Sequence, residues 1–508
     1  MSDNTKPGMG FEVNIRSKSS QSRKVEINPD SPMNIAVMGD FSGKTSQSRK
    51  TPIGKRRFVK IDRDNIEEVM ASLNISLNLI MDGKNVQLKI NEFDDFHPDE
   101  LYEKVETFSQ LRSLRRRLKN NNTFQEAASE IQSWLPEKEM TSSIEKQPVV
   151  EKTTASGNLL DDILDSQSNQ TPDASSYETA QIDKLIKSIV APYVEPSADP
   201  RQDEMIEIVD KATQRHMRDI LHNDEFQAIE SAWRSLYFLV TRIETGSSLK
   251  IMLLDINKEE LQQDVALDDI SQSSVYKKFC DPSEGDEPWG LLIGNYTFTD
   301  TIDDILSLAN IASIAEQSSA PFISSASETF VGCESFASTP DYEDWNREMS
   351  EGVSEAWSLV RNSPSASYIG LALPRFLLRL PYGKKSKPVD AFKFEEMPEG
   401  HCHECYLWGN AAFIKAEMIA RNFNQHAWEM NPQEVYQTDG LPMAYYSEDG
   451  ETVTKPVAEI YLTERGGEII NKHGLITLWS VRNSDTIKSA DYRSISESTD
   501  NISGRWSW

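Results

Sequence analysis

Continuous apolar runs mark the first strands that this chain predicts. Three stretches, 33–39, 249–255 and 289–296, are almost uninterrupted in their apolar residues. Strands with this pattern are typically buried on both faces, because helices cover both sides of their sheet. The runs therefore predict the inner strands of a sheet that helices enclose.

Alternating and helical periodicities define further elements. Apolar residues alternate with polar ones at 75–79 and 86–90, and Asp82-Gly83 between them predicts a β-hairpin. Apolar residues instead recur every three or four positions over much of 181–242 and 301–318, which predicts amphipathic helices. We expect an α+β protein, with two α/β domains of mixed sheets and packed helices joined by a flexible acidic linker.

Polar stretches divide the chain into five expected segments. They are an N-terminal polar arm (1–30), a first domain (31–135), a linker (136–180), a second domain (181–484) and a polar C-terminal tail (485–508). In the arm, Phe11, Val13 and Ile15 alternate with polar residues, and a strand there needs a sheet edge to join. Chance alternation in a disordered tail explains the same residues equally well.

Two arginines, Arg375 and Arg379, lie four residues apart in the apolar block LPRFLLRLPYG. An unpaired buried charge is costly, so each must have a partner or reach solvent. Glu395 and Glu396 follow beside aromatic residues. The sequence favours structural ion pairs between these arginines and glutamates. Surface arginines that contact another copy are the alternative.

A short apolar stripe lies within the linker. Leu159, Leu160, Ile163 and Leu164 share one helical face among aspartates, between polar and Pro-containing stretches. A helix of one or two turns is too short to fold alone. It either docks into the groove of a partner or packs on its own domain.

The motif HCHEC offers four potential metal ligands, His401, Cys402, His403 and Cys405. A tetrahedral site usually draws its second ligand pair from elsewhere, and adjacent residues converge poorly on one ion. We therefore favour a surface turn over a metal site here, and expect no cofactor.

The strand at 33–39 leads into the turn GDFSG, which invites a nucleotide-binding interpretation. The spacing matches neither GxxxxGK[ST] nor GxGxxG, and the polar stretch after it predicts no helix. We therefore do not predict nucleotide binding. No nucleophile–base pair is evident either, and we expect a protein that is not an enzyme.

Charge is unevenly distributed along the chain, whose formal net charge is −28. Residues 1–135 carry 21 Lys and Arg against 19 Asp and Glu, and the remainder carries 32 against 62. This acidic excess argues against nucleic acid as a partner. Within the first segment, Arg112, Arg115, Arg116 and Arg117 form a basic helical face, which is either solvated or meets an acidic neighbour.

The compartment is predicted from three absences in the sequence. No run of about 18 apolar residues occurs, so we expect no membrane insertion. The N-terminus lacks the basic-then-apolar pattern of a signal peptide. Four cysteines in 508 residues fit a reducing compartment. Together these features predict a cytoplasmic protein.

Two sets of blocks resemble the contractile sheath of the type VI secretion system. LPRFLLRLPYG, FKFEE and YLWGNAAF, in this order, resemble the large subunit (TssC/VipB, EvpB/ImpC family). GDFSG, the block 57–65 and DDFHPD resemble the small subunit (TssB/VipA). The chain thus resembles a small subunit fused ahead of a C-terminally shortened large subunit.

The resemblance implies a structural protein that assembles by strand exchange into a tubular polymer, which contracts to propel an inner tube. It implies other sheath subunits, the inner tube protein, the baseplate and a ClpV-type AAA+ disassembly ATPase as partners. The stripe of Leu159, Leu160, Ile163 and Leu164 would then be the helix that the ATPase recognises. An accessory protein that caps or seeds a sheath of full-length subunits is the alternative.

Overall fold

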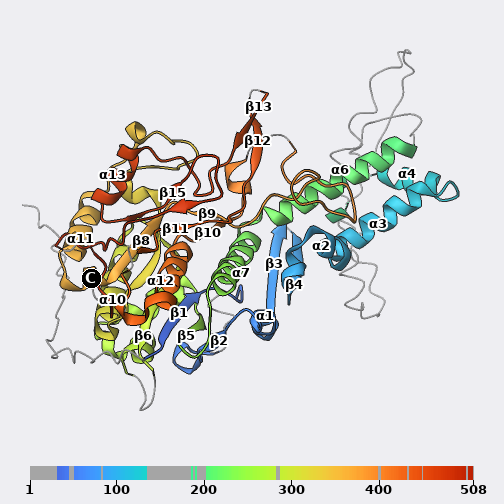
Figure 1. Cartoon of the computed structure of the whole chain (residues 1–508). Helices are drawn as coiled ribbons and strands as arrows, with labels where there is room; N and C mark the ends of the chain where they lie inside the picture. Colours follow the sequence, from blue (N-terminus) through green and yellow to red (C-terminus); the bar gives the residue numbers. More distant parts are fainter. Residues whose placement is uncertain are drawn as a thin grey trace, which may run out of the picture.

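A seven-stranded sheet forms the centre of the molecule (Figure 1). Its order is β14-β8-β7-β6-β1-β5-β2, and neighbouring strands are parallel except for β2 with β5. The strands are β1 (Met33–Gly39), β2 (Val59–Ile61), β5 (Leu249–Asp255), β6 (Trp289–Phe298), β7 (Phe322–Ala326), β8 (Ile369–Leu373) and β14 (Ile476–Thr477). The computed structural model describes residues 31–44, 51–81, 84–133, 185–186, 189–190, 202–281, 287–398, 402–431, 434–448, 450–498 and 501–506.

Helices cover both faces of this sheet, which explains why β1 is buried along its whole length. Successive side chains of a strand point to opposite faces. Met33, Ile35 and Val37 accordingly join the core under α7 (Asp224–Arg242) and α12 (Ala412–His426). Ala36 and Met38 join the opposite core. The helices on that side are α8 (Lys258–Val265), α9 (Ser274–Cys280), α10 (Ile302–Ser318) and α11 (Glu351–Arg361).

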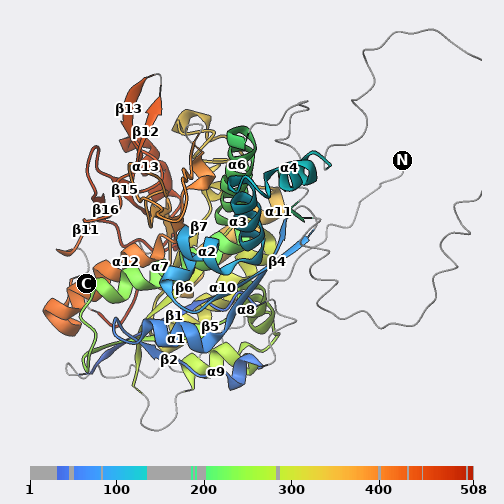
Figure 2. The same ribbon diagram turned by 90° about the vertical axis from the view of Figure 1, so that its right-hand side faces the viewer.

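A helical arm projects from the sheet (Figures 1 and 2). The hairpin of β3 (Ile75–Met81) and β4 (Lys84–Ile90) leads into it after α1 (Ile66–Leu73), and this hairpin confirms the predicted one. The arm contains α2 (Pro98–Lys104), α3 (Glu106–Lys119), α4 (Phe124–Gln132) and α6 (Gln202–Leu221). α3 packs along α6, so both halves of the sequence contribute to the arm.

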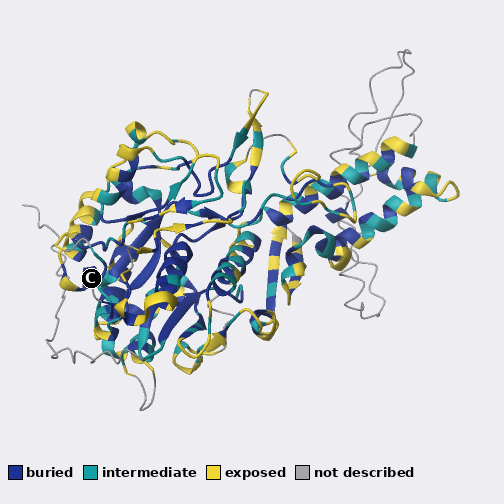
Figure 3. Cartoon of the chain, viewed as in Figure 1, coloured by how far each residue is buried: buried dark blue, intermediate teal, exposed yellow. Residues whose placement is uncertain are grey.

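Smaller elements from residue 376 onward complete the molecule. β9 (Phe376–Leu377) pairs with β10 (Trp408–Gly409), and β12 (Tyr445–Glu448) pairs with β13 (Glu451–Thr454). A three-stranded sheet has the order β11-β16-β15. Its strands are β11 (Gln437–Thr438), β15 (Trp479–Ser480) and β16 (Ile487–Lys488), and α13 (Glu464–Lys472) lies before β14. Exposed residues cluster on the β12–β13 hairpin and on the arm, whereas the sheet is buried (Figure 3).

The α+β class is confirmed, and the two segments contribute strands to one sheet. β1 lies between β5 and β6, pairing over Met33–Gly39 with Leu249–Asp255 and over Asn34–Met38 with residues 289–294. β2 also belongs to this sheet. The segments 31–135 and 181–484 therefore share one sheet, because the first supplies strands that the second surrounds.

The C-terminal segment is polar in sequence, yet it is packed rather than a solvated tail. Tyr492, Ile495, Ile502 and Trp506 are all buried. Arg505 donates to the carbonyls of Trp289 and Ser318, at 2.8 and 3.0 Å. The C-terminal segment therefore packs against one end of the central sheet. The expected arm 1–30 and linker 136–180 lie outside the described residues.

Candidate functional site

The GDFSG turn joins the two halves of the chain and does not form a phosphate cradle. The Asp255 carboxylate, at the end of β5, accepts hydrogen bonds from the N–H groups of Phe41 and Ser42 at 2.9 and 3.2 Å. It also accepts the Ser42 hydroxyl at 2.8 Å, and Trp233 donates to the Phe41 carbonyl at 2.9 Å. Backbone donors that a phosphate would need are therefore held by an internal carboxylate.

Two ion pairs also connect residues of the first segment (31–135) to residues of the second segment (181–484). Arg56 binds Glu260 through both terminal nitrogens, at 2.9 and 2.5 Å. Arg115 on α3 binds Asp210 on α6 at 2.5 and 3.0 Å. Bidentate guanidinium–carboxylate pairs fix orientation as well as distance. They hold the sheet edge and the arm in register across the two halves.

Arg379 is the centre of a buried ion cluster. Its Nε donates to Glu230 Oε1 at 2.9 Å, and its two terminal nitrogens donate to Glu396 at 2.9 and 3.1 Å. Its guanidinium also lies 4.4 Å from the centroid of the Tyr382 ring. Arg379 is 5 % exposed, and both carboxylates are fully buried. Of the two glutamates expected from the sequence, Glu396 is the one that pairs with Arg379.

The electrostatics of this cluster are balanced. Arg234 also binds Glu230, at 2.7 Å, so two guanidinium groups face two carboxylates. Burial alone would raise the pKa of Glu396. The charge of Arg379, hydrogen bonds from Arg379 and the Tyr382 N–H, and the His222 ring 3.5 Å away outweigh burial and lower that pKa to about 2.

Arg375 has different partners from those expected. It binds Glu459 at 2.5 Å and Glu404 at 3.3 Å. Its backbone N–H also donates to Glu459 at 3.0 Å. Glu395 instead accepts the Lys384 N–H at 3.1 Å. Burial raises the pKa of Glu459, but Arg375 and His403 outweigh this effect and lower it to about 2.

These two glutamates predict a stability that depends on pH. The ordinary pKa of a glutamate is 4.5, whereas the pKa values of Glu396 and Glu459 fall to about 2 in the fold. Their contribution, about 3 kcal/mol each at full effect, is therefore present above pH 4.5 and lost between pH 4.5 and 2. Urea unfolding across this range should show the decline. Glu396→Gln should make it shallower, and an unchanged slope in that variant would contradict the assignment.

The HCHEC motif contains a disulfide in place of two free thiols. Cys402 and Cys405 are joined in a disulfide, so neither offers a thiolate. The His403 ring lies between Lys455 and Glu459, at 2.8 and 3.0 Å, and His401 is outside the described residues. Among the described residues no group of three or more His, Cys, Asp or Glu is placed to hold a metal ion.

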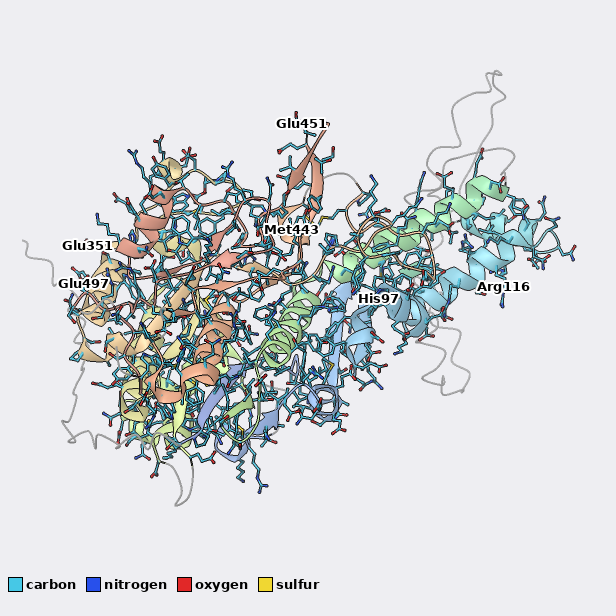
Figure 4. All side chains as sticks on the ribbon, in the orientation of Figure 1. His97, Arg116, Glu351, Met443, Glu451 and Glu497 are labelled. Carbon is cyan, nitrogen blue, oxygen red and sulfur yellow. A yellow bond between two sulfur atoms is a disulfide. The ribbon has the colours of Figure 1, made fainter. Side chains whose placement is uncertain are left out.

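The basic face of α3 is largely neutralised within the chain. Arg112 pairs with Glu103, Arg115 with Asp210, and Arg117 with Glu130. Arg116 is exposed and points away from the arm (Figure 4). This face therefore offers far less free positive charge than its sequence suggests.

A polar cavity of about 380 Å³ is lined by none of the predicted site residues that the structure describes. Its lining is Arg361, Asn471, Lys472, Gly474, Arg493, Ser494, Ser496 and Glu497. Arg361 and Glu497 form an ion pair within it, at 3.4 Å. An internal carboxylate thus already partners one of its cations.

Sequence patterns missed Glu230, Glu459 and Asp255, although Glu230 carried a signal. It lies four residues after Phe226 and three before Trp233 on the buried face of α7. An acid at such a position needs a cationic partner. The stripe of Leu159, Leu160, Ile163 and Leu164 lies outside the described residues. In the described part of the chain, no helix combines the length and apolar character that a membrane crossing requires.

Comparison with known proteins divides the chain where its two halves meet. Residues 203–495 match the VipB family (EvpB/VC_A0108, tail sheath N-terminal domain). Residues 12–148 match the family described as type VI secretion system, VipA, VC_A0107 or Hcp2. The type VI secretion system sheath protein TssC1 of Pseudomonas aeruginosa is 35 % identical over 276 residues, or 52 % of this chain and 55 % of that protein. The chain thus spans about half the length of this curated relative.

Proposed function

Because this chain belongs to the type VI secretion sheath family, with a VipA-type and a VipB-type segment in one polypeptide, we propose that it is a sheath protomer with both subunit types covalently joined. The family is one of structural proteins rather than enzymes. A single chain fixes the ratio of the two segments at one to one. It also removes the entropic cost of bringing two separate polypeptides together.

The pairing of β1 with β5 and β6 carries this proposal. A VipA-type strand buried between two VipB-type strands joins the two segments in one sheet. Large rearrangements of a packed body proceed by rigid-body motion rather than by continuous deformation. We therefore expect each protomer to move as a whole when the polymer changes its geometry.

Polymerisation would proceed through strand exchange between copies. β2 and β14 are the edge strands of the seven-stranded sheet as described. The alternating segment with Phe11, Val13 and Ile15 would donate a strand to a neighbouring copy, where main-chain hydrogen bonds supply the strength. Heterologous contacts of this kind generate helical polymers when their rotation does not close. Contraction of such a tube would propel an inner tube.

A second candidate function is an accessory protein that caps or seeds a sheath of full-length subunits. The chain matches TssC1 over about half of that protein's length. Electron microscopy of the purified chain distinguishes the two functions. Tubes would support the protomer, whereas single particles that bind only to pre-formed sheath would support the accessory role.

The proposed partners are other sheath subunits, the inner tube protein, the baseplate and a ClpV-type AAA+ ATPase, all at a cytoplasmic site of assembly. The ATPase would recognise the stripe of Leu159, Leu160, Ile163 and Leu164. Burying each of these side chains in a groove contributes roughly 1.5–3 kcal/mol before ordering costs. This is enough for a short helix to bind.

Replacing Leu160 and Ile163 together by Asp should abolish binding of the disassembly ATPase and leave the thermal melt nearly unchanged. The reason is that charged side chains cannot enter an apolar groove without a large desolvation cost. Binding is measured by pull-down or fluorescence anisotropy with the purified ATPase. The matched control is Asp161→Asn with Asp162→Asn, which alters the polar side of the stripe and should retain binding. Unfolding of the Leu160→Asp, Ile163→Asp variant would instead identify the stripe as core.

A further inference from the structure

The Cys402–Cys405 disulfide closes a short turn just before β10. Cys402 is exposed and Cys405 is partly exposed, so a reductant in solution can reach this pair. The proposed assembly gives this disulfide no role. It is a redox-capable pair that no other function of the fold uses.

The two residues enclosed by the disulfide hold distant parts of the chain together. The His403 ring contacts Lys455 and Glu459, and Glu404 contacts Arg375. Gln227 on α7 donates to the Glu404 carbonyl at 3.2 Å. The turn is therefore a junction of α7, the segment before β9 and the segment after β13.

The hydrogen bonds at His403 define its tautomer. A protonated Lys455 donates to Nδ1, at 2.8 Å, so Nε2 carries the hydrogen that Glu459 accepts at 3.0 Å. Trp408 also donates to the His403 carbonyl, at 3.0 Å. These contacts require the backbone of the turn to keep its conformation. The disulfide restrains that backbone directly.

The other two cysteines, Cys280 and Cys333, are poorly suited to thiol–disulfide exchange. Burial raises the pKa of Cys280 to about 12, and Cys333 is fully buried with its pKa also raised by burial. Thiols with raised pKa values form little thiolate and react slowly. Cys402 is thus the one exposed cysteine of the four, and Cys280, which is partly exposed like Cys405, forms little thiolate because of its raised pKa.

We propose that Cys402 and Cys405 form a reversible thiol–disulfide site that is reduced by dithiols and that controls the order of the junction around His403. One thiolate of the dithiol attacks the exposed Cys402 sulfur and releases Cys405 as a thiolate. The second thiol of the reductant, as its thiolate, then displaces Cys402 and closes the reductant's own disulfide. The protein gains two electrons and two protons, and the dithiol loses the same.

Reduction should loosen the turn and its partner segments while the central sheet stays intact. The junction is at the surface, and the contacts of Glu404 are half-exposed. Local opening there does not require unfolding of the buried sheet. The expected signature is therefore local, in residues 402–408 and 453–460.

The test uses the full-length protein with and without dithiothreitol. Differential alkylation under native conditions should leave Cys402 and Cys405 unmodified in the oxidised protein and label both after reduction, with Cys333 unlabelled and Cys280 labelled slowly and equally in both states. Hydrogen exchange in 402–408 and 453–460 should accelerate by about tenfold or more on reduction. Exchange in β1 and β5 should not change.

The control is the Cys402→Ser, Cys405→Ser variant. It should exchange like the reduced protein and show no response to dithiothreitol. The proposal is overturned if the air-oxidised native protein labels fully at Cys402 and Cys405. It is also overturned if reduction leaves exchange in both segments unchanged, or if the double variant exchanges like the oxidised protein.

Discussion

Replacing Arg379 by alanine is expected to lower the free energy of unfolding by roughly 3–5 kcal/mol, because it leaves a buried carboxylate without its partner. Arg379 is 5 % exposed and contacts the fully buried Glu230 and Glu396. Arg234 can neutralise only one of these two acids, so the variant carries an unbalanced negative charge in the core. Equilibrium unfolding in urea, followed by tryptophan fluorescence, measures the change.

Two further variants make the interpretation specific. Arg116→Ala removes the same side chain from an exposed position on α3 and should change stability by no more than about 0.5 kcal/mol. The Arg379→Ala, Glu396→Ala double variant should cost less than the sum of its two single changes, since the pair is coupled. A loss below about 1 kcal/mol for Arg379→Ala would instead indicate a solvated ion pair.

The strands could be predicted from the sequence because the pattern of apolar and polar residues within each strand indicates which of its faces are buried. The run MNIAVMG is apolar on both faces, and the structure places it in the interior of a helix-covered sheet. The hairpin of β3 and β4 was equally accessible, since alternation and a turn dipeptide are local signals.

Strand order could not be predicted in the same way. β1 pairs with residues more than two hundred positions later, and nothing in its own residues specifies those partners. This non-local pairing explains why the sequence did not predict that the two segments share one sheet.

The partners in an ion pair could likewise be predicted when they are close in sequence, and could not when they are distant. Glu396 lies 17 residues after Arg379 in the same aromatic-rich stretch, and proximity was a useful guide to that pair. Glu230 is 149 residues away, and Glu459 is 84 residues from Arg375. Buried acids can be recognised from an apolar helical face, but their partners are chosen by the fold.

Cutting the chain between Glu137 and Ser156 is expected to leave its two pieces associated. A specific protease site placed there would separate residues of the VipA-type segment from those of the VipB-type segment. β1 would still lie between β5 and β6, with the Arg56–Glu260 and Arg115–Asp210 pairs alongside it. The cut protein should elute from size-exclusion chromatography at the volume of the uncut chain.

The matched variant is Val37→Asp, which places a charge at the centre of β1. Val37 is 0 % exposed and lies opposite Leu253 and Ile293 in the sheet, so the carboxylate has neither solvent nor a cation to meet. We expect a loss above about 4 kcal/mol, the size that burial of an unpaired charge produces. The cut variant should therefore separate into its pieces or precipitate, because β5 and β6 lose the strand that fills the space between them. Wild-type pieces that elute separately after the cut would contradict the shared sheet, and with it a protomer that moves as one body.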